Sequence, residues 1–338
     1  FPSMVIEGKT RGLSLGDAQF EAEAVRAHLG GSFAEMLRAA VAHPVMLEYL
    51  DQTRSFGPNS LVGRQRGRGL NENLAREVLE LHTLGVDGGY TQDDVRELAE
   101  ALTGFVTREG VFQFHPGAAE PGAETVLGQS YGGGDPDPGH AFAILDDLAH
   151  HPTTARHIAR KLATHFVADV PDTALVDHIA ARFAATGGDL PSVHAALIEH
   201  PAAWEGFGAK IKQPWEVVVS TFRAFGIDAE TLDGGRPRAL RGMARALGSM
   251  GQPLRDPGGP NGWPEAAEAW ITPQGLAARI DWARTSAARL GGEMDPRRFL
   301  ETALADAASV ELGFAVGAAE TAEEGIFLTL AAPEFHRR

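Results

Sequence analysis

Glycine and proline divide this 338-residue chain into many short segments, with 40 Gly and 20 Pro along its length. Between these breaks apolar residues recur mostly at helical spacing, and strand-like alternation is rare. The pattern predicts an all-α fold, a single large multi-helix domain over 1–338 with at most one small β-hairpin. We expect helices at 15–30, 32–42, 44–51, 71–84, 92–103, 139–149, 153–167, 172–185, 190–199, 213–225, 236–248, 273–289, 296–304 and 320–330.

The expected hairpin pairs residues 111–114 with residues 125–128 across a loop rich in Gly and Pro. Two further Gly/Pro clusters, near 132–139 and 255–262, are candidate subdomain hinges. Helix density is similar on both sides of each cluster, which favours one continuous helical domain over two.

Composition excludes several classes of function. A formal net charge of −15 argues against general affinity for nucleic acid or anionic lipid, since both require clustered positive charge. Cysteine is absent, which excludes disulfides, thiolate metal sites and cysteine nucleophiles. The sequence contains no run of about 18 apolar residues, so it predicts no membrane-spanning helix. The chain starts at Phe1 without a signal-peptide pattern, so we expect an upstream part of the domain to be missing.

The helix expected at 71–84 carries the most informative polar face. Arg76, Glu77 and Glu80 each fall within about 60° of Asn73 on a helical wheel. Two carboxylates three residues apart can bind a divalent metal or divide acid and base roles, because repulsion separates their proton affinities. The alternative is a helix-stabilising network in which Arg76 pairs with Glu72 and Glu80 at four-residue spacing.

Two neighbours in this helix have different expected roles. Asn73 shares the polar face and would orient a substrate. His82 falls on the opposite, apolar arc, which predicts a hydrogen-bonded core histidine rather than a third ligand beside the carboxylates.

The helix expected at 153–167 places Lys161 and His165 one turn apart at the border of its buried stripe. A half-buried lysine requires a carboxylate, and Glu77 or Glu80 would provide one, since an unpaired buried charge costs several kcal/mol. Both a structural ion pair and a catalytic role in a pocket are consistent with this pattern.

Arg68 and Trp263 are the remaining binding candidates. Arg68 ends a short basic run in front of the 71–84 helix, where it would bind an anion at the helix N-terminus or pair with surface acids. Trp263 lies in a loop braced by Pro264, where it would line a pocket mouth or close a core.

Several motifs are spread over nearly the whole chain. They are Asn71-Glu72-Asn73-Leu74-Ala75-Arg76-Glu77, Leu81-His82-Thr83-Leu84-Gly85-Val86, Gly89-Tyr90-Thr91-Gln92-Asp93-Asp94-Val95, His151-Pro152-Thr153-Thr154-Ala155-Arg156, Lys161-Leu162, Lys212-Gln213-Pro214-Trp215-Glu216, Gly251-Gln252-Pro253-Leu254 and Gly262-Trp263-Pro264. In this order they resemble one bacterial family, the domain of unknown function 1800.

The resemblance implies a mainly helical, exported protein that is periplasmic or secreted, often encoded beside a secreted sulfatase-like protein, with no established reaction. Two departures from the family pattern matter. Members usually carry a Trp-x-Asn-His-Phe segment whose last residue corresponds to Phe1. Members also show a histidine where this chain has Ala119.

The leading functional hypothesis is an exported enzyme, with a divalent metal as a candidate cofactor, whose polar pocket lies between the helices at 71–84 and 153–167. The catalytic candidates are Glu77, Glu80, Lys161 and His165, with Glu77 and Glu80 also the metal candidates. Asn73, Arg76, Arg68 and Trp263 are the substrate-binding candidates. The rival hypothesis is a non-catalytic binding or assembly partner of the sulfatase-like protein, in which the same polar residues only fix helix register.

Overall fold

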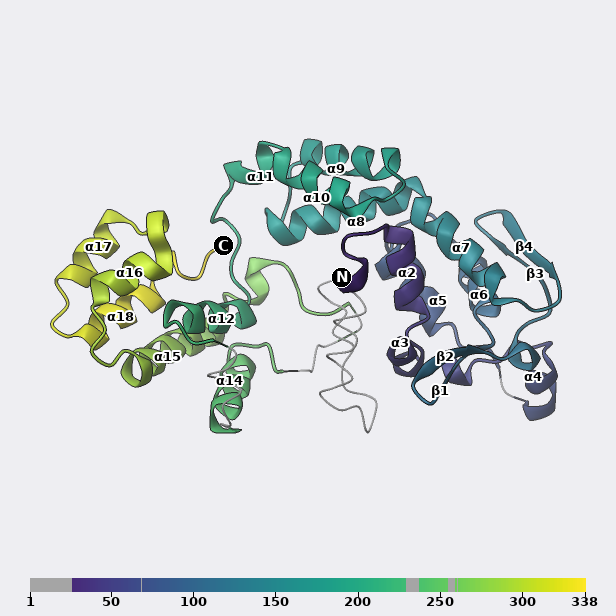
Figure 1. Ribbon diagram of the computed structural model, residues 1–338, viewed down its shortest axis with the longest axis horizontal. Coiled ribbons are helices and arrows are strands. Elements are labelled where there is room, and N and C mark those ends of the chain that lie inside the picture. The colour runs from purple at the N-terminus through teal and green to yellow at the C-terminus, as the bar shows by residue number, and fades with distance from the viewer. Residues whose placement is uncertain (1–25, 68, 229–236, 255–258, 260) are drawn as a thin grey trace. The chain divides into compact units, whose positions relative to one another are not determined.

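The computed structural model describes residues 26–67, 69–228, 237–254, 259 and 261–338 (Figure 1). The chain divides into two compact units, which are described separately. Unit 1 takes in Phe1–Ala163, Pro171–Ala203 and Gly259–Gly262, and unit 2 takes in Thr164–Val170, Trp204–Gly258 and Trp263–Arg338. The candidate hinge at 255–262 is mostly outside the described residues. The expectation of one continuous domain stays a prediction.

Unit 1 begins with short helices and ends in a helical layer. Its helices are α2 (Phe33–Val41), α3 (Pro44–Tyr49), α4 (Leu61–Arg66), α5 (Asn73–Glu77), α6 (Gln92–Ala101), α7 (Pro138–His150), α8 (Pro152–Phe166), α9 (Thr173–Ala185), α10 (Leu190–Glu199) and α11 (Ala202–Glu205), with a π-helix at Val78–His82. The last residues of α8 and α11 belong to unit 2. In Figure 1, α9 and α10 lie side by side.

Several of these helices begin where the sequence places a cap. Thr91 accepts a hydrogen bond from the backbone N–H of Asp94, and the Asp94 carboxylate accepts one from the backbone N–H of Thr91. This reciprocal capping box satisfies two N–H groups that a helix start leaves without partners. Gly104, with φ 85°, follows the end of α6. The start agrees with the sequence prediction, and the end at Ala101 is two residues before the predicted end at 103.

The strand pairing differs from the expected hairpin. Unit 1 contains two separate antiparallel pairs, β1 (Phe105–Arg108) with β2 (Val111–Phe114), and β3 (Gly122–Val126) with β4 (Gln129–Gly134). Phe105 is opposite Phe114, so residues 111–114 pair with the strand before them rather than with 125–128. The candidate hinge at 132–139 also begins inside β4. The mainly helical fold class is confirmed, with two small sheets in place of one.

Each strand pair turns at two residues in the left-handed region. Glu109 and Gly110 have φ 54° and 74°, and Leu127 and Gly128 have φ 51° and 79°. Two successive positive φ values give the tight turn whose twist matches that of antiparallel strands. Neither turn was predicted from the sequence, because neither Glu-Gly nor Leu-Gly is the usual Asn-Gly or Asp-Gly signal.

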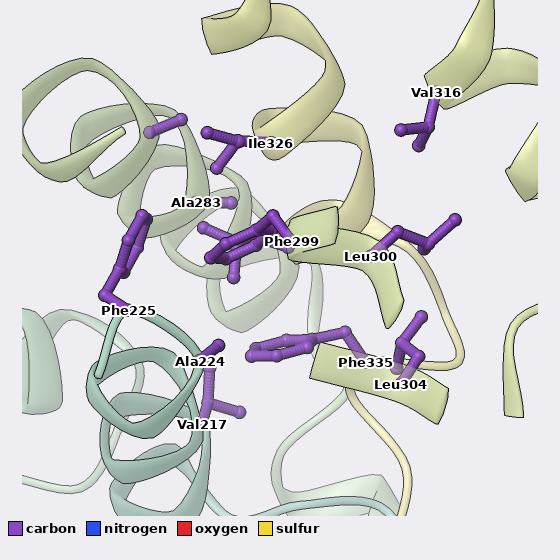
Figure 2. Packing of buried hydrophobic residues seen from close by; sticks show 12 residues of the cluster. Val217, Ala224, Phe225, Ala283, Phe299, Leu300, Leu304, Val316, Ile326 and Phe335 are labelled. Carbon is purple, nitrogen blue, oxygen red and sulfur yellow. The ribbon is translucent and has the colours of Figure 1, made fainter. Parts of the chain in front are cut away.

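Unit 2 is built from α12 (Pro214–Ala224), α14 (Pro237–Ser249), α15 (Pro273–Leu290), α16 (Pro296–Leu304), α17 (Val310–Gly317) and α18 (Ala322–Ala331). Helix α18 packs against α15, α16 and α17. Figure 2 shows the core between them, where Phe225 and Phe299 meet with ring centroids 4.7 Å apart and Phe335 lies beside them. The helix at α17 was not predicted from the sequence.

Candidate functional site

The segment from Asn71 to Gly85 is only partly the regular helix that the sequence predicts. The Asn71 side chain accepts a hydrogen bond from the backbone N–H of Asn73, the first residue of α5, at 2.9 Å. After Glu77 the chain changes to a π-helix over Val78–His82. The hydroxyl of Thr83 then donates to the carbonyl of Val78 at 2.7 Å. Single π-turns inside helices are frequent at functional sites.

Arg76 is the centre of a polar network on the solvent side of this segment. Its guanidinium lies 3.2 Å from the Glu72 carboxylate and 3.3 Å from the Glu80 carboxylate. It also donates to the Gln92 side chain at 3.0 Å, and Gln92 donates to Glu72 at 2.8 Å. The pairs at four-residue spacing are those that the sequence predicts. Gln92, from the following helix, is the member that the sequence analysis missed.

Glu77 is in a different environment from Glu80, although the two residues are one turn apart. Burial, followed by the negative charge of Glu80, raises the pKa of Glu77 from 4.5 to about 7, while Arg76 opposes this rise. Glu80 has Arg76 as an ion partner. A carboxyl that keeps its proton near neutrality, next to one that is paired with a cation, is the arrangement in which two acids can take different roles.

Two tyrosines lie close to these carboxylates. The Tyr90 hydroxyl hydrogen bonds to Glu80, and burial together with that bond raises the pKa of Tyr90 to about 12. Tyr49, the last residue of α3, has a raised pKa through burial and then through the charge of Glu77. Both hydroxyls therefore stay protonated at physiological pH and are hydrogen-bond donors beside the carboxylate pair. Neither tyrosine was among the residues predicted from the sequence.

Helix α8 contacts the π-helix through His157. The His157 ring nitrogen Nε2 lies 3.2 Å from the carbonyl oxygen of Leu81. A side chain added to Gly85 would place its Cβ 2.7 Å from His157 Nδ1, so this close approach requires glycine. Burial, with the nearby Lys161 charge, lowers the pKa of His82 to about 3, which keeps that ring neutral as expected of a core histidine.

His165, which the sequence analysis grouped with Glu77 and Glu80, makes its described contact elsewhere. It belongs to unit 2, where its Nδ1 lies 2.7 Å from the Glu265 carboxylate, one hundred positions along the chain. Lys161 belongs to unit 1. Its charge lowers the pKa values of His82 and His157, and burial is the larger cause of both shifts. The two α8 candidates are therefore parts of different local environments.

The remaining predicted binding residues are placed as follows. Trp263 is half-buried, with its ring 6.1 Å from that of Trp270, and the Trp270 indole donates to the carbonyl of Pro264 at 3.0 Å. Asn73 is exposed at the start of α5. Arg68 lies outside the described residues.

A second charged cluster, in unit 2, was missed by the sequence analysis. Lys210 is almost completely buried, and its ammonium lies 2.6 Å from Asp169 and 3.6 Å from Glu265. Glu265 directly follows Trp263 and Pro264, which the sequence had marked as a candidate binding loop. No separate sequence feature singled out Glu265. No sequence signal marked Lys210 as a partner.

Within the described ranges, no group of three or more His, Asp or Glu side chains is arranged to hold a metal ion. In the same part of the chain, no helix is both long enough and apolar enough to cross a bilayer.

Sequence comparison now places the chain in a family. The sequence model of one family, described as a protein of unknown function (DUF1800), matches residues 4–337. The chain belongs to the DUF1800 family. This confirms the resemblance found from the motifs, and the description assigns no activity. Comparisons of this DUF1800 chain with curated proteins and with solved structures give no match.

Proposed function

We propose that this DUF1800 chain is an acid–base enzyme whose site in unit 1 uses Glu77 as the proton donor and Glu80 as its charged partner. The single observation that supports the proposal most is the environment of Glu77. Its pKa of about 7 keeps a large share of the carboxyl protonated at neutral pH. Glu80, with Arg76 at 3.3 Å, is the carboxylate of the pair.

Cleavage of a glycosidic bond is the reaction class that fits this pair best. That chemistry requires one carboxylic acid to protonate the leaving oxygen and a second carboxylate to act as base or nucleophile. Glu77 ends α5 and Glu80 lies in the π-helix that follows directly, so both carboxyls belong to one segment. Asn73 and Gln92, exposed at the edge of the network, would hydrogen bond to sugar hydroxyls.

The test measures reducing-sugar release from a neutral β-glucan and from peptidoglycan. We expect activity in the wild-type protein, a loss of at least about 100-fold in Glu77→Gln and in Glu80→Gln, and no change in Glu48→Gln. Glu48 is an exposed carboxylate in α3 and is the matched control. Activity should fall above about pH 7, where Glu77 loses its proton.

A direct titration decides the matter independently of substrate choice. Carboxyl-carbon NMR on the wild-type protein should show one glutamate that titrates near pH 7 and disappears from the spectrum of Glu77→Gln. A Glu77 that titrates at its ordinary value, together with no glycan cleavage, would overturn the proposal.

A divalent metal bound by the same two carboxylates is the other chemistry to test at this site. The mutual repulsion of Glu77 and Glu80 is the observation that favours a shared cation. Elemental analysis of protein purified without chelators should find stoichiometric metal that Glu77→Gln loses. Absence of metal from the wild-type protein would reject this alternative.

The second candidate function is assembly with a secreted sulfatase-like protein. The observation in its favour is that Val310 and Phe314, one turn apart on α17, are 85% and 79% exposed. Contiguous exposed apolar side chains are typical of interaction sites. We expect copurification of the partner, lost in Val310→Ser/Phe314→Ser and kept in Leu61→Ser, an exposed residue of unit 1. Recovery unaffected by the α17 change would reject this surface.

Export to the periplasm or beyond remains part of the proposal and rests on the family resemblance. Fractionation of cells that express the complete gene should find the mature protein outside the cytoplasm. Recovery only in the cytoplasm would contradict it.

A further inference from the structure

Unit 2 contains a histidine–carboxylate pair that the proposed unit 1 site does not use. His165 lies in the last turn of α8, and its Nδ1 is 2.7 Å from the Glu265 carboxylate. When a carboxylate accepts a hydrogen bond from Nδ1–H, the neutral ring has Nε2 as its basic nitrogen. The pair therefore fixes both the tautomer and the orientation of the imidazole.

A buried lysine holds Glu265 in place. Lys210, with its side chain 1% exposed, donates to the Asp169 carboxylate at 2.6 Å and to the backbone carbonyl of Glu265 at 2.9 Å. Asp169 in turn accepts from the backbone N–H of Ala267 at 2.7 Å. The loop that carries Glu265 is thus held at this residue and two residues after it, as preorganised catalytic groups require.

The charges around the pair keep Glu265 ionised. Burial alone would raise the pKa of Glu265, but the hydrogen bond and charge of His165 and the charges of Lys210 and Arg338 lower it below its ordinary value. An ionised carboxylate stabilises the imidazolium that forms when Nε2 takes a proton.

We infer that His165 is the general base of a second acid–base centre, that Glu265 is its positioning residue, and that the substrate is a neutral ester. The oxygen of a water molecule would bond to the carbonyl carbon while its proton moves to Nε2. The carbon–oxygen bond of the alcohol would then break, and the departing oxygen would take the proton back from Nε2.

The surroundings favour a neutral substrate over an anionic one. Asp169 and Glu265 balance Lys210 and Arg338, so these four side chains together carry no net charge. The ring of Phe166, a residue 56% exposed, meets the His165 ring edge-on at 4.6 Å between centroids. This apolar surface beside the base suits the hydrocarbon part of an ester.

The first test is hydrolysis of p-nitrophenyl acetate by the full chain and its variants. We expect the wild-type rate to exceed that of His165→Gln by at least about 10-fold, with most of the rate lost in Glu265→Gln and partly restored in Glu265→Asp. The control is His150→Gln, because His150 is an exposed histidine whose Nδ1 contacts a backbone carbonyl, that of Asp146, at 2.7 Å rather than a carboxylate. Equal rates for the wild-type protein and His165→Gln would overturn the inference.

The second test needs no variant and remains decisive even if the substitutions unfold the protein. Nitrogen-15 NMR of the neutral His165 ring should show the proton on Nδ1 and none on Nε2. A proton on Nε2 would overturn the inference. Neither test involves Glu77, so the inference stands or fails independently of the function proposed for unit 1.

Discussion

Glu77 in unit 1 and Glu265 in unit 2 are the same type of residue and are both half-buried, but their pKa values move in opposite directions. Burial is the largest influence on each and raises both values. At Glu77 the next influence is the like charge of Glu80, and the pKa rises to about 7. At Glu265 the next influences are His165, Lys210 and Arg338, and the pKa falls.

Neighbouring charge therefore decides what a half-buried carboxyl does in this protein. Beside a like charge the carboxyl keeps its proton, weakens the fold when it ionises and becomes available for proton transfer. Among cations it stays ionised and contributes to stability, so that it orients another group instead. The same contrast predicts opposite consequences for substitutions in the two units.

The largest expected effect is at Lys210 in unit 2. Lys210→Met should lower the free energy of unfolding by about 3 kcal/mol, because it leaves Asp169 and Glu265 without their buried cation. Urea unfolding measures it. Arg284→Met is the control, since the Arg284–Asp281 pair is exposed and should contribute under about 0.5 kcal/mol. A loss at Lys210 no larger than that of the control would mean that the unit 2 charges are not coupled.

Removing the charge of Glu265 should lower the free energy of unfolding by less than the Lys210 change does, and the loss should depend on pH. Glu265→Gln should cost about 1–2 kcal/mol at pH 7, a range reduced for partial solvent exposure. Because the folded-state pKa of Glu265 lies below 4.5, its contribution is complete above that pH and is lost as the pH falls through the lowered pKa. Thermal unfolding of both proteins from pH 7 to pH 3 should show the difference shrinking. A constant difference would contradict the lowered pKa.

The corresponding change in unit 1 should act in the opposite direction. The folded-state pKa of Glu77 lies above its ordinary value, so wild-type stability should decrease as the pH rises from 4.5 to about 7. Glu77→Gln should remove this decrease and be at least as stable as the wild-type protein at pH 8, by up to about 1 kcal/mol after allowance for solvent screening. A loss of about 2 kcal/mol would instead identify Glu77 as a structural ion-pair member.

Several features of unit 1 were predicted from the sequence because they depend on neighbouring residues. The start of the helix at Gln92 and the pairs of Arg76 with Glu72 and Glu80 depend on residues within about four positions of one another. The change from α5 to the π-helix was not predicted, because no local pattern marked the bond of the Thr83 hydroxyl to the Val78 carbonyl.

Contacts distant in sequence account for what was missed at the second site. His165 and Glu265 are one hundred residues apart, and Lys210 reaches Asp169 across forty-one. Helical periodicity locates each of these residues on a face of its own element but does not say which faces meet. The expected pairing of Lys161 with Glu77 or Glu80 came from the need for a partner, which identifies the type of group and not its position, and it stays a prediction.

The smallest expected effects are shifts in the pKa of Glu77 when its two charged neighbours are changed. Glu80 and Arg76 should shift this pKa in opposite directions. Glu80→Gln removes the like charge and should lower the pKa of Glu77, but not to 4.5, because burial is the larger cause of the shift. Arg76→Gln removes the cation and should raise the pKa. Each change should cost only about 0.3–0.5 kcal/mol, since the pairs of Arg76 are partly exposed. Carboxyl-carbon NMR of Glu77 in the three proteins measures both shifts. Titrations that move in the same direction, or not at all, would show that burial alone sets the pKa of Glu77 and that the contrast with Glu265 has another cause.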